Sequence, residues 1–345
     1  MTQLFTKKAS LWFRGLAIIL VVLSHYAEWW AWFTPTEGNA ELFRNACSRL
    51  GPYGVAIFFL FSGYGLVYSI GSKPMNLRFI IRRILATYLP YLIIVGMIEA
   101  LSGGFSDLKD FGEYLNGHDY WYMVVLFWFY IGFICIWTIH LRRRSKDPAA
   151  QLSTPADHPA NRHIHAVLFV LFTWALSYRL YAAGEHSFWY ISNPAFVLGI
   201  LLALYEPFFK KLLDASRSPM LVLTTAGMAV SVYYALFSAA PNQWTPEKTV
   251  RYEYLAVFIW TVLIIYLASD LQRFDPVLPL LGKWSLYLYL THQFIFMRVI
   301  NEMTGSFDTR FIVAAILTIV ISLALGKLIG LLTAPLEKQL KKQRN

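Results

Sequence analysis

The sequence is short of charged side chains. Only 14% of its 345 residues are Asp, Glu, Lys or Arg, whereas soluble domains carry about 25%. With 57% hydrophobic residues and a mean hydropathy of +0.48, the chain lacks the polar groups that would cover a water-facing globule. The composition therefore excludes an ordinary soluble domain and indicates a membrane protein.

Cysteine is equally scarce. The two cysteines, Cys47 and Cys135, fall in an expected loop and an expected apolar helix, so they predict no disulfide framework. The sequence shows no internal repeat and no separate soluble domain. No small-residue cleavage site follows the first apolar run, so we expect that run to be kept as a membrane span.

Long apolar runs are what the chain has instead. A helix needs about 20 apolar residues to cross the hydrocarbon core of a bilayer. We therefore expect an all-α polytopic membrane protein, a single domain over residues 1–345 with about ten transmembrane helices. The sixth is interrupted by a Ser-Asn-Pro sequence at residues 192–194. The expected spans are Leu11–Phe33, Tyr53–Ile70, Phe79–Leu101, Trp121–Leu141, Ile164–Ala182, Phe188–Tyr205, Met220–Ala239, Tyr254–Ser269, Pro276–Ile300 and Phe311–Thr333.

The basic residues lie in clusters between these runs. The net charge of +10 therefore does not indicate a nucleic-acid-binding surface, and we expect no nucleic acid partner. With the N-terminus inside, the inner connections carry 19 Lys and Arg and the outer ones carry 6. Basic loops are retained in the cytoplasm. We expect cytoplasmic termini, a cytoplasmic loop at 142–163, a basic cytoplasmic tail at 334–345, and an inner (plasma) membrane location among membrane lipids.

The first expected helix carries ionisable groups, which cost at least about 2.5–3.5 kcal/mol inside a span and are therefore functional candidates. Arg14 and His25 are eleven residues apart, so they share one helical stripe about 16 Å long, with Glu28 close to it. The alternatives are an interfacial anchor for Arg14 and a helix–helix hydrogen bond for His25. Their common stripe favours a functional role for both.

The ninth expected helix offers a matching group. Ser285, Tyr289 and His292 follow i, i+4, i+7 spacing and share a face. Measured from the inner side, His292 lies about as deep as His25, so we predict that the two rings can bound one cavity. The alternative is a structural histidine near the outer interface.

Two further clusters have both a structural and a functional interpretation. Ser62 lies beside Gly63 and Gly65 in the second span, and we favour tight helix packing over a serine nucleophile, because no partner base or elbow motif accompanies it. Arg82 and Arg83 lie at the inner end of the third span. They set topology or clamp phosphate groups, whose geometry matches the guanidinium fork.

An aromatic pair begins the fourth span. Trp121 and Tyr122 follow His118 and Asp119 in an acidic outer loop. We interpret the pair first as an interfacial aromatic belt and second as a stacking surface for a substrate.

Taken together, several of these residues match a family pattern. The Arg14-to-His25 spacing, FFLFSGYGL in the second span, the pair Arg82–Arg83, and LLGKWSLYLYLTH in the ninth resemble the acyltransferase-3 family. Its members are multipass membrane acyltransferases that modify surface polysaccharides, lipid-linked sugars and similar acceptors. The resemblance extends in order through nearly the whole chain.

The resemblance implies ten spans with cytoplasmic ends, an acyl-CoA donor, an essential histidine at His25 and an essential arginine at Arg14. It implies no metal and no bound cofactor, since acyl-CoA (acetyl-CoA) is a co-substrate. Ala56 and Ile57 stand where members often have an acidic residue, so no carboxylate role is expected there. Some members carry an appended hydrolase-like domain, and we expect any such activity to come from a partner glycan-synthesis protein.

The resulting hypothesis is an O-acyltransferase, with acetyl the expected acyl group and a carbohydrate or lipid-linked glycan as acceptor. His25 is the expected base, since neutral imidazole suits proton transfer near pH 7. Arg14 would orient the donor and Arg82 and Arg83 would contact CoA phosphates. His292, Tyr289 or Glu28 would position the acceptor or the His25 ring. Direct transfer and an acyl-histidine intermediate both remain open, as does a glycan or lipid transporter without acyl transfer.

Overall fold

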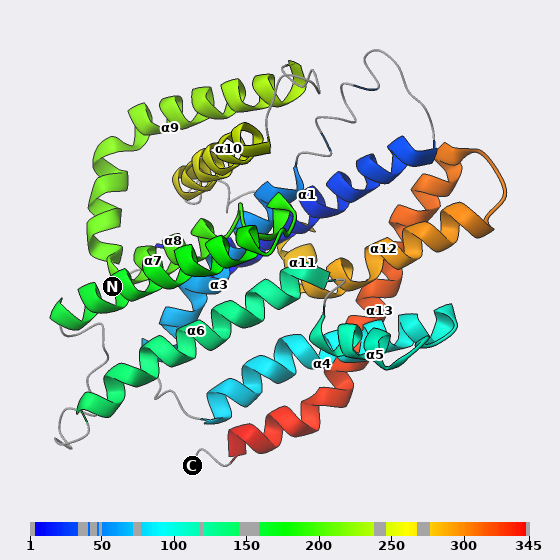
Figure 1. The fold of residues 1–345 in the computed structure, drawn as a ribbon, viewed down its shortest axis with the longest axis horizontal. Coiled ribbons are helices and arrows are strands. Elements are labelled where there is room, and N and C mark those ends of the chain that lie inside the picture. The colour runs from blue at the N-terminus through cyan, green and yellow to red at the C-terminus, as the bar shows by residue number, and fades with distance from the viewer. Residues whose placement is uncertain are drawn as a thin grey trace. The chain divides into compact units, whose positions relative to one another are not determined.

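A computed structural model shows that the protein is helical (Figure 1). The structure describes residues 4–33, 41, 47, 50–71, 77–117, 120–144, 159–237, 246–267 and 277–342. No β-strand occurs in these ranges, which confirms the all-α fold class.

Each of the ten expected apolar segments is mostly helical over the part that is described, with turns at residues 190–193 of the sixth and at Trp284 of the ninth. α9 contains Pro219, and its ribbon is sharply bent (Figure 1). The helices are α1 (Lys7–Phe33), α3 (Gly51–Gly71), α4 (Leu77–Ser102), α5 (Leu108–Asn116), α6 (Trp121–Arg144), α7 (Pro159–Ala182), the 3-10 helix η4 (Ser187–Trp189), α8 (Pro194–Leu204), α9 (Glu206–Phe237), α10 (Pro246–Leu267), α11 (Val277–Lys283), α12 (Ser285–Glu302) and α13 (Phe307–Lys342).

Six segments of the described chain are long and apolar enough to cross a membrane, or seven if α5 and α6, bent by 58°, form one span. α9 and α10 contain shorter apolar stretches, Ser218–Val230 and Glu253–Leu263. The protein is therefore an all-α multi-pass membrane protein, while ten spans and cytoplasmic termini stay predictions. The six are Lys7–Trp30, Gly51–Ile70, Ile81–Ser102, Arg162–Ala182, Ser187–Leu204 and Phe307–Pro335.

The helices group into two compact units. Unit 1 comprises Met1–Pro74 and Val125–Gly282, and unit 2 comprises Met75–Val124 and Lys283–Asn345. Within the expected 142–163 loop, α6 continues to Arg144 and α7 begins at Pro159, while residues 145–158 lie outside the described chain. Within the expected 334–345 tail, α13 continues to Lys342.

Unit 1 is held together by α3, which packs against α1, α8 and α10. Glycines allow two of these helices to approach its backbone closely. A Cβ added to Gly63 would lie 2.2 Å from Phe196 O on α8, and one added to Gly199 would lie 2.0 Å from Leu60 O on α3. This reciprocal pair confirms tight packing as the role of Gly63.

The ninth expected segment is not one helix, which corrects the prediction of a continuous span over Pro276–Ile300. α11 ends at Lys283, Trp284 forms a turn, and α12 begins at Ser285. Just before this turn, Gly15 and Gly282 form a second close crossing, because a Cβ on Gly282 would lie 1.8 Å from Leu11 O. α11 is thus packed on α1. The sequence prediction counted the depth of His292 along one helix axis. The turn at Trp284 invalidates that count.

Unit 2 is built from α4, α5, α12 and α13. α12 packs along α13, where the hydroxyl groups of Thr291 and Ser322 are 2.6 Å apart. α5 is tied to α4 by tyrosine hydroxyls: Tyr88 donates to Leu115 O at 2.6 Å and Tyr114 donates to Leu92 O at 2.7 Å. These bonds hold the short α5 against the long α4.

Candidate functional site

α1 presents the Arg14–His25 stripe as one unbroken helix. It runs without interruption from Lys7 to Phe33, so the two side chains are separated by about 16 Å along the axis. Ile18 and Val21, which lie between them on the stripe, are 1% and 2% exposed. The stripe therefore faces the interior of unit 1, with Arg14 and His25 half-buried at its two ends.

α3 packs beside this stripe. A Cβ on Gly54 would lie 2.8 Å from a methyl carbon of Val21, and one on Gly51 would lie 2.9 Å from Ser24 Oγ. The N-terminal end of α3 thus packs on the turn of α1 that carries His25. The His25 ring lies against Trp29, with centroids 5.5 Å apart and planes tilted by 36°.

The other unit 1 candidates differ in exposure. Glu28 follows His25 by one turn, and its side chain is exposed. Ser62 is half-buried beside Gly63, at the α3–α8 crossing. That location supports a helix-packing role for Ser62.

The remaining predicted site residues belong to unit 2. Arg82 and Arg83 are half-buried on α4, and the Arg83 guanidinium carbon lies 5.5 Å from the centre of the Phe79 ring. Because Arg14 belongs to unit 1, a common donor site for the three arginines remains a prediction.

His292, the second candidate histidine, is a buried residue of α12. Ser285, Tyr289 and His292 are all buried within this one helix. His292 Nδ1 lies 2.7 Å from Tyr289 O. Because a carbonyl oxygen can only accept, Nδ1 carries the proton in this bond, and the lone pair of the neutral ring is on Nε2. His25 lies in the other unit, so the shared cavity stays a prediction.

The Trp121–Tyr122 pair does not form a simple interfacial belt. Tyr122 is 8% exposed, and its ring packs edge-on against Tyr289 with centroids 5.3 Å apart. Tyr120 also contacts Tyr289 and donates to Leu290 O at 3.2 Å. Tyr122 is therefore a core residue of unit 2, whereas Trp121 is half-buried. The neighbouring positions 118 and 119 lie outside the described residues.

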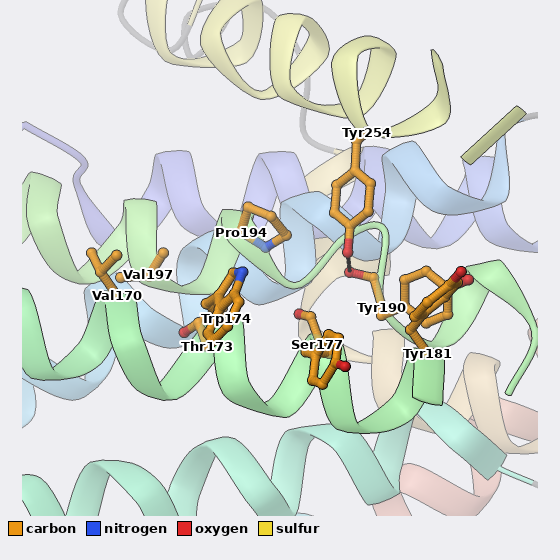
Figure 2. A pocket seen from close by; sticks show the side chains of 10 residues that line it. Val170, Thr173, Trp174, Ser177, Tyr181, Tyr190, Pro194, Val197 and Tyr254 are labelled. Carbon is orange, nitrogen blue, oxygen red and sulfur yellow. Dashed lines mark hydrogen bonds between the residues drawn. The ribbon is translucent and has the colours of Figure 1, made fainter. Parts of the chain in front are cut away.

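A pocket that the sequence interpretation missed lies in unit 1, between α7, the start of α8 and α10 (Figure 2). Its volume is about 410 Å³, within the range of small-molecule sites. Five aromatic rings supply much of its wall. The lining residues are Val170, Thr173, Trp174, Ser177, Tyr178, Tyr181, Tyr190, Pro194, Val197 and Tyr254.

This pocket forms where the sixth expected span is interrupted. The chain leaves η4 after Trp189, passes through a turn at residues 190–193 and enters α8 at Pro194, as the Ser-Asn-Pro sequence predicts. The turn is fixed by two bonds. The Tyr254 hydroxyl donates to Tyr190 O at 3.1 Å (Figure 2), and Ser192 Oγ donates to Pro52 O at 2.9 Å.

The same turn carries buried polar atoms. Asn193 is 0% exposed and donates from Nδ2 to Ser177 Oγ at 3.1 Å. Within the described chain, Asn193 Oδ1 and the Oγ1 of Thr173 are buried without a hydrogen-bond partner. Such atoms cost about 1–3 kcal/mol each when left unsatisfied.

The fold defines a class of protein, an all-α multi-pass membrane protein. A family model described as an acyltransferase domain matches residues 11–327. The chain therefore belongs to the acyltransferase-3 family and is a membrane acyltransferase. No curated protein and no solved structure matches the chain.

Proposed function

We propose that this acyltransferase moves an acyl group, acetyl in our expectation, from cytoplasmic acyl-CoA to a hydroxyl of a carbohydrate or lipid-linked glycan, with His25 as general base. The observation that supports this proposal is the interior-facing stripe of α1. It carries a guanidinium and an imidazole about 16 Å apart in a chain of this family.

The chemistry assigned to these groups is simple proton and acyl transfer. His25 removes the proton from the acceptor hydroxyl as the oxygen attacks the thioester carbonyl. The C–S bond then breaks, the CoA sulfur leaves and is protonated, and an ester remains on the acceptor. Arg14 orients the donor or stabilises its charge, because a guanidinium binds anionic oxygens through a planar fork.

The sidedness of the reaction follows from the solubility of the donor. CoA is a polyanion that cannot dissolve in hydrocarbon, so its phosphates need cations at a water-facing surface. The predicted inner connections hold 19 of the 30 Lys and Arg residues. Arg82 and Arg83 are the proposed phosphate contacts at the start of α4. The acceptor would approach from the opposite end of the helices.

The test is release of CoA from acetyl-CoA by the purified protein in phosphatidylcholine liposomes, with a panel of dodecyl glycosides as acceptors. We expect His25→Ala to reduce turnover by more than about tenfold, or 1.4 kcal/mol, at normal protein level. His186→Ala is the matched control, since that histidine is exposed beside η4. A His25→Ala protein that keeps more than about a tenth of wild-type turnover would remove His25 as principal base.

The transporter alternative makes the opposite prediction. A transporter would move the glycoside across the liposome membrane without releasing CoA. Glycoside movement together with no CoA release for any member of the panel would contradict the proposed function.

A further inference from the structure

The aromatic wall of the α7–α8–α10 pocket faces outward from the protein. Trp174 and Tyr178 are 66% and 59% exposed, and their rings stack with centroids 5.7 Å apart and planes within 12°. On a membrane-spanning helix, such exposure is to the bilayer or its interface. The pocket is therefore open to molecules that arrive laterally through the membrane. Flat ring faces also suit the apolar C–H face of a sugar ring.

The pocket lining includes two aliphatic hydroxyl groups, those of Thr173 and Ser177. Thr173 lines the pocket, is 4% exposed, and its Oγ1 has no partner within the described chain. Ser177, also in the lining, accepts a hydrogen bond from Asn193, which is not part of the lining. A plain hydrocarbon ligand would leave Thr173 Oγ1 unsatisfied. A ligand with several hydroxyl groups can both donate to and accept from the hydroxyls of Thr173 and Ser177.

A second, aliphatic pocket adjoins the first. Its volume is about 270 Å³, and it shares Pro194 and Tyr254 with the aromatic pocket. The rest of its lining is almost entirely apolar: Ile191, Ala195, Leu198, Leu255, Val257, Phe258 and Thr261. An aromatic pocket with a polar side next to an aliphatic one matches an amphipathic ligand.

We infer that the α7–α8–α10 pocket is the acceptor site and that the acceptor is a sugar bonded to a hydrocarbon chain. The sugar ring occupies the aromatic pocket against Thr173 and Ser177, and the chain occupies the aliphatic pocket beyond Tyr254. This inference rests on the proposed function and narrows its acceptor to a lipid-linked sugar.

Packing contacts within unit 1 connect this pocket to the turn of α1 that carries His25. Ser192, in the turn before Pro194, donates to Pro52 O at the start of α3. The adjacent Gly51 lies against Ser24, the neighbour of His25. The acceptor pocket and the proposed base therefore pack on the same end of α3.

Photolabelling tests the site without requiring turnover. The probes are dodecyl glucoside, dodecyl galactoside and dodecyl N-acetylglucosaminide, each with a diazirine in the alkyl chain, added to the protein in phosphatidylcholine nanodiscs. We expect at least one to label the peptides that contain Leu198 or Phe258. The same dodecyl glycoside without the diazirine should compete, whereas the free sugar and dodecanol should not.

Variants then test the polar side of the pocket. Thr173→Val removes one hydroxyl at constant shape and should weaken labelling about fivefold, the effect of one neutral hydrogen bond. Thr224→Val is the matched control, because Thr224 is also a buried helical threonine but bonds to Met220 O in its own helix. Size-exclusion profiles before and after heating show whether each variant is folded.

The outcomes separate this inference from the proposed function. Labelling of these peptides that Thr173→Val weakens and Thr224→Val does not supports the inference, even if CoA release fails. Labelling that is absent for all three glycosides, or equal with diazirine-bearing dodecanol, overturns the inference. In that case CoA release that depends on His25 would still support the proposed function.

Discussion

The crossing of α3 and α8 allows a stability test with a control in the same helix. A Cβ added to Gly63 would lie 2.2 Å from Phe196 O and 3.1 Å from the carbonyl carbon of Phe196. A Cβ added to Gly65, two residues further along α3, would meet nothing within 4 Å. Gly63→Ala and Gly65→Ala therefore add the same methyl group to the same helix, with and without a clash.

The magnitude follows from the atoms that would clash. An ordinary C···O contact is about 3.3–3.6 Å, so the alanine at 63 would push the two helices apart by about 1 Å. Phe196 O belongs to the backbone and cannot move away by a change of rotamer. Overpacking costs about 1–3 kcal/mol. The gain in helix propensity, about 0.8–1 kcal/mol, is common to both variants and cancels in the comparison. We expect Gly63→Ala to be less stable than Gly65→Ala by about 1–3 kcal/mol.

The assay is the folded fraction that remains monodisperse on size exclusion after heating, measured for both variants in the same detergent. Gly63→Ala should lose its folded peak several degrees below Gly65→Ala. Gly199→Ala should behave like Gly63→Ala, because its Cβ would lie 2.0 Å from Leu60 O. Equal melting of Gly63→Ala and Gly65→Ala would refute the close crossing and with it the packing of α8 on α3.

Three further predictions concern the chemistry. Arg14→Lys should not restore normal affinity for acetyl-CoA, measured by equilibrium binding, because a point charge does not replace a planar fork; near-normal affinity would reduce Arg14 to an anchor. His292→Ala should lower CoA release per folded molecule, and unchanged release would leave His292 a structural residue that bonds Tyr289 O. In sealed vesicles, labelled acetyl-CoA supplied outside should support transfer when the cytoplasmic face is outward. Transfer only in right-side-out vesicles would overturn the predicted orientation.

The helices could be predicted because each depends on a property of its own segment. Apolar runs of about 20 residues indicate spans wherever they occur, and α1, α3 and α13 follow that rule. The stripe from Arg14 to His25 needs only the helical repeat, and an unbroken α1 satisfies it. The break before Pro194 could also be predicted from its own segment, because proline starts helices more readily than it continues them.

Features that depend on partners in space could not be predicted. The close approach of Gly282 to Leu11 O joins two residues that are distant in the sequence, and the turn at Trp284 comes directly after it. The pocket wall on α7 shows i, i+4, i+7 spacing of Trp174, Tyr178 and Tyr181, which is equally typical of an interfacial aromatic belt. Only the three-dimensional structure shows that these rings border a pocket.

The turn at residues 190–193 explains how polar atoms come to lie beside that pocket. Breaking a helix inside a membrane exposes backbone groups that must find partners. Here Tyr190 O accepts a hydrogen bond from Tyr254 of α10, and Ser192 Oγ ties the turn to Pro52 O of α3. The bond from Tyr254 offsets part of the cost of the break, and the two bonds together hold the turn between α3 and α10.

Two side-chain oxygens next to the turn have no such hydrogen bond within the described chain. Asn193 Oδ1 and Thr173 Oγ1 lack partners in the described chain, although both residues are buried. In hydrocarbon, such groups are more costly than in water-facing loops. The Thr173 hydroxyl, which lines the pocket, is therefore better explained by a ligand with hydroxyl groups than by packing alone. An acceptor of acyl groups is a ligand of that kind.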